Sequence, residues 1–213
     1  MNHKKHLPLY LFLLGFNLAG SSIVLADEEE DAEEIQENLE TLLEDKECSE
    51  CNLKGVKVKA KKKKNRLNFN EADLSQSDLQ GAKFIRVNLK EANFEGAKLQ
   101  GAKFLKVDLR EANFEGANLA GAKLRGADLR GANFTKANLQ GADLSEAKLK
   151  EANFEEADAT GAEFQFADLT GATLTKANFD KAQLSNAILT GAEIEDASFK
   201  DAEVTGVIRA KDD

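Results

Sequence analysis

The residues best suited to chemistry are Cys48 and Cys51, a CxxC pair between an acidic stretch and a lysine-rich one. Two thiols at this spacing can form a structural disulfide, or they can exchange electrons with another dithiol. No histidine follows the second cysteine, as it would in a c-type haem motif, and two cysteines alone do not complete a usual zinc site. We therefore expect a structural disulfide or a pair of buried thiols, with a redox role for the pair as the alternative.

Other catalytic side chains are concentrated at the N-terminus. Both histidines, His3 and His6, and the only tyrosine, Tyr10, lie within residues 1–26. This segment has a short basic start, an apolar stretch and Ala26 before an acidic run, which is typical of a secretory signal peptide cleaved after Ala26, with an uncleaved membrane anchor as the alternative. The exported chain would contain no imidazole to move protons or bind a metal. We expect a protein that is not an enzyme and has no cofactor or metal site.

An apolar residue occurs at every fifth position from Phe69 to Val204, with the small Ala159 as the exception. Nearly all of these central residues are Leu or Phe, and Ala stands two positions before most of them. Neither a helix, with about 3.6 residues per turn, nor a strand, with a period of two, keeps such a pattern on one side. Short repeats of this kind are typical of solenoids, in which each turn buries its inner face against the next.

Similarity at multiples of five residues indicates how many units make one turn. Residues 81–100 and 101–120 agree at 14 of 20 positions. We therefore expect about seven to eight four-sided coils, each made of four units, in which residue n lies beside residue n + 20. This register predicts inner columns of like apolar residues. It also predicts an outer column of amides that hydrogen-bond along the stack, formed by Asn93, Asn113, Asn133 and Asn153.

The units ANFEG, AKLQG and ADLRG resemble those of the pentapeptide-repeat family, and the resemblance covers roughly residues 51–207. It implies an all-β solenoid, a right-handed quadrilateral parallel β-helix with Leu or Phe inside, Ala beside it and a turn at each corner. It implies little about activity. Repeats of this type also resemble those of many cyanobacterial proteins. Cyanobacteria have both a periplasm and a thylakoid lumen, so an exported chain of this kind is expected in one of these two compartments.

Residues 27–50 form an acidic segment with apolar residues at helical spacing, so we expect one amphipathic helix over residues 28–46. The open first coil of a solenoid exposes core side chains and unpaired strand edges. We expect this helix to be an N-terminal α-helical cap for that coil, with binding of a partner by its apolar stripe as the alternative. Its apolar stripe consists of Ile35, Leu39, Leu42 and Leu43.

The repeat starts near Cys51, but the central residues Leu53 and Val58 are one position out of phase with Phe69. A Lys-rich insertion must therefore interrupt the β-helix, and we place it at about residues 59–66. We interpret it as a projecting loop that is either a solvated, disordered bulge or an anchor for an anionic surface, such as a membrane, a glycan or a protein. Its lysines are Lys61, Lys62, Lys63 and Lys64.

The chain ends in a short tail, residues 208–213, without a convincing capping helix. The last coil near Val207 would then present an open edge that could pair with another molecule. We expect an end-to-end homodimer through this edge.

The register also predicts the composition of the outer walls. In the N-terminal half, one wall combines basic and aliphatic side chains, whereas farther along it turns to Asp143 and Glu163. We interpret the first part as a partner-binding wall, formed by Lys83, Ile85, Arg86, Lys103, Leu105, Lys106, Lys123 and Arg125. A second basic column is expected to be neutralised by neighbouring glutamates. It contains Lys90, Arg110, Arg130 and Lys150, beside Glu91, Glu111 and Glu151.

Three functions follow from these features. The first is a non-catalytic exported scaffold that presents charged outer walls to a protein or an anionic partner. The second, implied by the family resemblance, is a DNA mimic that inhibits a type II topoisomerase. It is disfavoured because basic residues are interspersed with acidic ones and the leader directs export. The third is redox chemistry at the CxxC pair. Nucleic-acid binding by the lysine loop is disfavoured because no exposed aromatic residue is nearby for base stacking.

Overall fold

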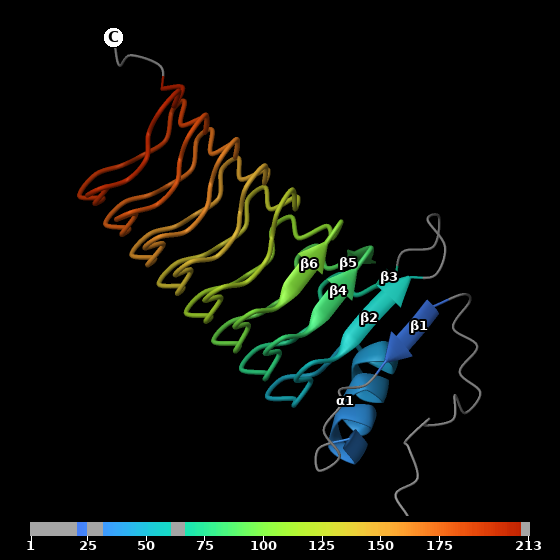
Figure 1. Ribbon diagram of the computed structural model, residues 1–213. Helices are drawn as coiled ribbons and strands as arrows, with labels where there is room; N and C mark the ends of the chain where they lie inside the picture. Colours follow the sequence, from blue (N-terminus) through green and yellow to red (C-terminus); the bar gives the residue numbers. More distant parts are fainter. Residues whose placement is uncertain (1–20, 25–31, 61–66, 210–213) are drawn as a thin grey trace, which may run out of the picture.

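The computed structural model describes residues 21–24, 32–60 and 67–209 of the chain. It contains one helix, α1 (Ala32–Glu44), among these residues. The strands are β1 (Ser21–Val24), β2 (Lys57–Ala60), β3 (Leu67–Asn68), β4 (Lys83–Ile85), β5 (Val87–Asn88) and β6 (Lys103–Leu105). Figure 1 shows an elongated stack of coils, with α1 and β1 at one end and the C-terminus at the other.

Parallel pairing between residues 20 positions apart builds the stack. In β4 and β6, Phe84 pairs with Phe104, and in β3 and β5, Leu67 pairs with Val87. Single bridges with the same offset continue along all sides as far as Ile188 with Ile208. The predicted coil of four units and the parallel β-helix are therefore observed.

The offset is larger before residue 60. Val58 in β2 pairs with Phe84 in β4, and Asn52 forms a bridge with Asp78, so that the partners are 26 rather than 20 positions apart. The additional residues lie between Ala60, which ends β2, and Leu67, which begins β3. The four lysines of this segment, Lys61 to Lys64, lie outside the described residues.

Leu, Phe and Ala side chains fill the lumen of the coils. The central Leu and Phe residues are fully buried over most of the solenoid, and so are the alanines that precede them. Aromatic rings stack from coil to coil, with centroids 5.0 Å apart for Phe114 and Phe134 and 4.8 Å apart for Phe134 and Phe154. A large residue beside a small one is what such a narrow core accommodates at normal packing density.

The corners depend on two local features. Every fifth residue from Glu71 to Gly206 has a left-handed backbone, and these residues include Lys106 (φ 58°) and Phe166 (φ 60°) as well as glycines. An Asn or Asp side chain one position before the central residue accepts a hydrogen bond from the backbone N–H two positions later, as between Asn113 and Glu115 (3.1 Å). This turn is the reason for Asn and Asp at that position, a role that we did not predict.

The N-terminal end differs in detail from the expectation. Helix α1 is shorter than predicted, and its Leu39 and Leu42 are buried in the core. The side chains of Ile35 and Leu43 lie outside the described residues. Strand β1, within the predicted signal peptide, pairs antiparallel with β2, with Ser22 opposite Lys59. We did not predict this strand, because a short stretch of an apolar leader carries no strand-specific period.

Candidate functional site

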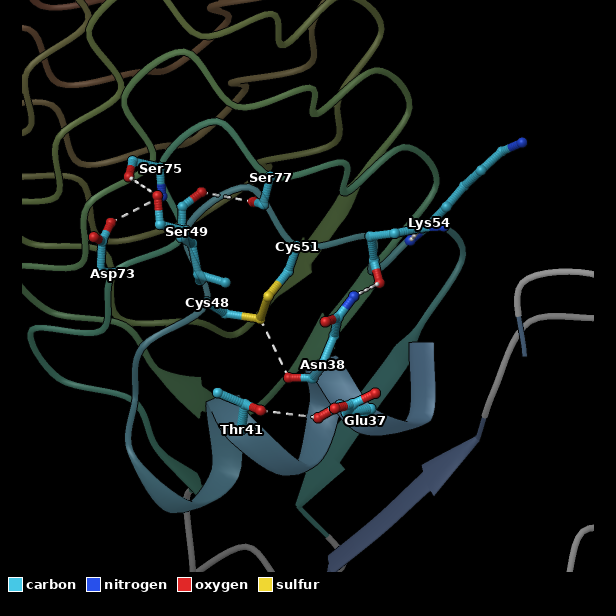
Figure 2. The surroundings of a disulfide bond; sticks show 12 residues. Glu37, Asn38, Thr41, Cys48, Ser49, Cys51, Lys54, Asp73, Ser75 and Ser77 are labelled. Carbon is cyan, nitrogen blue, oxygen red and sulfur yellow. Dashed lines mark hydrogen bonds between the residues drawn. A yellow bond between two sulfur atoms is a disulfide. The ribbon is translucent and has the colours of Figure 1, made fainter. Parts of the chain in front are cut away.

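The two cysteines are joined by a disulfide, with their Cα atoms 5.3 Å apart (Figure 2). Cys48 is 2% exposed, and Cys51 is partly buried against the core. The sulfur of Cys48 lies 3.2 Å from the carbonyl oxygen of Asn38 in α1. Asn38 also donates from its amide to the carbonyl of Asn52, at 3.1 Å. The disulfide therefore lies at the junction between the helix and the first coil.

The part of the chain described by the structure contains no group of three or more His, Cys, Asp or Glu residues that could hold a metal ion. Within the same residues, none of the helical structure has the length and apolar character that crossing a membrane requires.

One outer column changes charge along the solenoid. Bridges connect its eight members in an unbroken series, so that their backbones lie side by side. We call this set the charged column: Lys57, Lys83, Lys103, Lys123, Asp143, Glu163, Gln183 and Glu203. Its first four residues are basic, and three of the last four are acidic. Three of the four lysines predicted for the partner-binding wall, Lys83, Lys103 and Lys123, are thus brought together in this column. Lys57 belongs to the column as well, although the prediction does not include it.

The positions beside the charged column contain the apolar part of the wall. Ile85 pairs with Leu105, and Leu105 is 45% exposed. At the adjoining corner, the N–H of Arg86 donates to the carbonyl of Leu105, at 2.9 Å, while its Nε is buried and has no hydrogen-bond partner among the described residues. Arg125 forms an ion pair with Glu146, at 2.6 Å. Of the predicted set, Arg125 is therefore neutralised within the chain.

The second basic column is neutralised, but mainly by other residues than we expected. Lys90 pairs with Glu91 (2.5 Å) and lies 3.5 Å from Glu111. The other three cations of the column pair with aspartates. For the two arginines the aspartate is two positions earlier in the sequence, and for the lysine it is 18 positions later. These pairs are Arg110 with Asp108 (2.8 Å), Arg130 with Asp128 (2.7 Å) and Lys150 with Asp168 (3.4 Å). Arg110 and Arg130 each donate from Nε and Nη2 to the two carboxylate oxygens of the aspartate two positions earlier, a pair of parallel hydrogen bonds.

Arg130 also changes the acidity of Asp128. Its Nε and Nη2 donate to the two carboxylate oxygens, at 2.7 and 2.8 Å. These bonds hold the pKa of Asp128 below its ordinary value, against the opposing effect of partial burial. The carboxylate is therefore charged at neutral pH and balances its neighbour, so this column offers little free charge to a partner.

The asparagine column hydrogen-bonds along the stack in its first part, as predicted. Asn113 donates to Asn93 at 3.2 Å, and Asn133 donates to Asn113 at 3.0 Å. Asn153 departs from the series, because its amide donates to the hydroxyl of Thr135 instead, at 3.0 Å. This column is a structural element of the wall.

The family model for pentapeptide repeats matches in eight copies, over residues 68–104, 106–135, 137–175 and 167–207. The chain belongs to the pentapeptide-repeat family. Known members of this family form β-helices of the kind described above. No curated protein sequence matches this pentapeptide-repeat protein.

Several solved structures are similar to this pentapeptide-repeat protein. One is a pentapeptide-repeat protein of the Arabidopsis thaliana thylakoid lumen, with 37% identity over 41% of this chain and a TM-score of 0.34. The match spans 65% of that protein's length. HetL, a protein involved in heterocyst differentiation regulation in the cyanobacterium Nostoc sp. strain PCC 7120, has 27% identity over 76% of this chain and 91% of its own, with a TM-score of 0.29. The plasmid-mediated fluoroquinolone resistance protein QnrB1 has 21% identity over 75% of this chain and 91% of its own, with a TM-score of 0.41.

Proposed function

We propose that this protein is a non-catalytic, exported scaffold whose charged column and the side chains beside it bind a protein or an anionic partner. The observation that carries this proposal is the uncompensated charge of the column. Lys83, Lys103 and Lys123 form no ion pair with any described residue. Like charges on adjacent strands, about 4.8 Å apart, repel each other and destabilise the free protein.

A partner of opposite charge would relieve this repulsion. The second basic column shows the contrast, because its cations already have carboxylate partners within the chain. On the charged column the repulsion remains available as binding energy, since it is removed only when another molecule supplies the counter-charge.

The same lysines also forgo a stabilising turn. At their position in the unit, Asn or Asp accepts a backbone hydrogen bond at the corner, as Asn93 does from Glu95 (3.1 Å). An ammonium has no acceptor and cannot make this bond. On this wall, three successive coils have lysine where Asn or Asp would stabilise the turn: Lys83, Lys103 and Lys123. Giving up a local stabilising interaction is expected at a surface that was selected for binding.

The organisation proposed for the whole chain follows the same reasoning. The leader, residues 1–26, directs export to the periplasm or to a thylakoid lumen, where a disulfide is stable. Helix α1 caps the first of about seven to eight right-handed four-sided coils, and Leu39 and Leu42 support this role because they enter the core. The exposed Val204 and Ile208 at the other end support an end-to-end contact.

The two alternative functions receive less support. A redox role requires an accessible sulfur, whereas Cys48 is 2% exposed and lies beneath α1. A DNA mimic requires a largely acidic face, whereas half of the charged column is basic. A structural disulfide and a protein-binding wall are therefore the functions that we assign to these residues.

Charge reversal tests the proposal. We expect the triple variant Lys83→Glu, Lys103→Glu and Lys123→Glu to capture at least about tenfold less of the native partner from an extract of the exported compartment, because attraction becomes repulsion. Capture would be measured by chemical cross-linking and quantitative mass spectrometry. The matched control changes three exposed lysines on other walls and corners to glutamate: Lys98, Lys136 and Lys148. An unchanged profile for the first variant, with a normal melting temperature, would mean that this wall is not the binding surface.

A further inference from the structure

The charge of the charged column reverses at its middle, between Lys123 and Asp143. We infer that this column binds a second copy of the same chain, lying side by side with the first and running in the opposite direction. The inference rests on the proposal that this wall binds a protein, and it names the partner.

A two-fold axis parallel to the strands, placed between Lys123 and Asp143, defines the arrangement. It lays each column of one copy over the same column of the other, with the order of the coils reversed. Counting outward from the axis in the observed register gives the facing residues. Lys123 faces Asp143 of the second copy, Lys103 faces Glu163, Lys83 faces Gln183, and Lys57 faces Glu203.

Each of these pairs occurs twice in such a dimer. The two-fold axis makes the wall self-complementary, because every lysine of the basic half meets an acidic residue or an amide oxygen. A parallel arrangement of the two copies would instead place lysine over lysine and glutamate over glutamate. The antiparallel arrangement therefore removes the repulsion along both halves of the column at once.

The exposed apolar side chains agree with the same axis. Leu105 and Phe166 are 45% and 62% exposed, and both lie on this wall or its adjoining corner. Phe166 adopts a left-handed backbone, which is costly for a bulky residue. In the dimer, Phe166 faces Lys106 of the second copy and lies next to its Leu105. An ammonium group is attracted to the face of an aromatic ring. The dimer would therefore give Phe166, which is exposed to solvent in the free protein, a favourable contact with Lys106.

The size of the wall limits the strength of the dimer. The seven spacings between eight coils, at about 4.8 Å each, give a length of about 34 Å, and three columns give a width of about 10 Å. The wall thus covers on the order of 350 Å² per copy, compared with about 800 Å² per partner in stable complexes. We expect a weak dimer that depends on salt, because its main attraction is between exposed charges.

Two single charge reversals test the geometry. In a homodimer of the Lys103→Glu variant, the new carboxylate at position 103 faces Glu163 of the other copy, and this repulsive pair occurs twice. In a homodimer of the Glu163→Lys variant, the new ammonium at position 163 faces Lys103 of the other copy, again twice. We expect each variant to self-associate at least about tenfold more weakly than the unchanged protein, measured by sedimentation equilibrium in about 20 mM salt. Lys98→Glu is the matched control, since Lys98 occupies the same position of the unit on the next wall and is exposed.

Mixing the two variants gives the most discriminating result. In the homodimer of the first variant, the new carboxylate at position 103 faces the unchanged Glu163 of the other copy. In the heterodimer, the same carboxylate faces the new ammonium at position 163 of the second variant. The second pair of the heterodimer joins the unchanged Lys103 to the unchanged Glu163. The mixture should therefore form a heterodimer of about the strength of the unchanged dimer, and about 0.5 M salt should dissociate it.

An end-to-end dimer predicts neither the loss in the single variants nor the recovery in the mixture. A parallel side-by-side dimer predicts no loss in the single variants, because it already places Lys103 over Lys103 and Glu163 over Glu163. A loss in each variant followed by recovery in the mixture is therefore specific to the antiparallel arrangement. A mixture that associates no better than the single variants, or an unchanged protein that is monomeric at low salt, would overturn the inference.

The failure of this inference and that of the proposed function are distinguishable. If the mixed variants do not associate but the triple lysine variant still loses its native partner, the wall binds a different protein and only the self-association is wrong. If the mixed variants associate but the triple variant captures the same proteins as before, self-association stands and binding of another partner at this wall is wrong.

Discussion

Replacing Phe134 by alanine is expected to lower the free energy of unfolding by about 3–5 kcal/mol. Phe134 is fully buried, and its ring stacks on Phe114 at 5.0 Å and on Phe154 at 4.8 Å. Alanine would leave a cavity in the lumen that the fixed coil spacing prevents from closing. Because each coil contacts only its neighbours, the loss weakens both adjoining interfaces. Urea unfolding followed by circular dichroism measures the difference.

The matched control for this variant is Phe166→Ala. The ring of Phe166 is 62% exposed, so its removal should change the free energy of unfolding of the monomer by less than about 0.5 kcal/mol. Measurements in about 0.5 M salt keep self-association out of the comparison. Similar losses for the two variants would mean that the central residues are not the core.

Replacing Leu42 by aspartate is expected to detach α1 from the solenoid. Leu42 is fully buried, and a carboxylate there would lose its hydration without gaining an ionic partner. Undocking the helix avoids this cost, but it exposes Leu39, and the burial of Leu42 is already lost through the substitution. Each of these leucines contributes about 1.5–3 kcal/mol when buried. The free energy of unfolding should therefore fall by about 3–6 kcal/mol. Amide hydrogen exchange should accelerate most in the first coil, residues 46–60.

Thr41→Asp is the control for the helix, because Thr41 is exposed on the same turn and the substitution adds the same charge. It should leave the exchange rates of residues 46–60 nearly unchanged. If Leu42→Asp behaved in the same way, α1 would not be a cap. If both variants accelerated exchange, the helix would be sensitive to charge rather than dependent on buried leucines.

The five-residue period predicted the fold because it constrains every side chain of the core. Central residues such as Phe94 and Leu109 recur at a spacing that no ordinary helix or strand keeps on one side, and similarity between every fourth unit determines the number of sides. The same register placed Lys83, Lys103 and Lys123 in one column. The residues of each outer wall can therefore be predicted from a repeat sequence, because the period already determines the path of the backbone.

Features that depend on pairing between unlike segments were not predictable in this way. Strand β1 pairs with β2 but lies outside the repeat, so no sequence periodicity predicts this strand or its pairing. Arg110 and Arg130 select Asp108 and Asp128 through two parallel hydrogen bonds, which spacing alone does not distinguish from pairing with a neighbouring glutamate. Lys57 was missed because the insertion shifts its pairing partner to Lys83.

An engineered disulfide tests whether residues 20 positions apart lie side by side on one wall, on which the fold and both proposals depend. The backbones of Lys103 and Lys123 are bridged in parallel, so their Cα atoms are close enough for a disulfide. The double variant Lys103→Cys and Lys123→Cys should therefore form this bond on mild oxidation, detected by peptide mass spectrometry. The variant Lys103→Cys and Asn118→Cys should not. A bond in the second variant and none in the first would mean that the coil closes after three units rather than four, and neither the charged column nor its two-fold partner would exist.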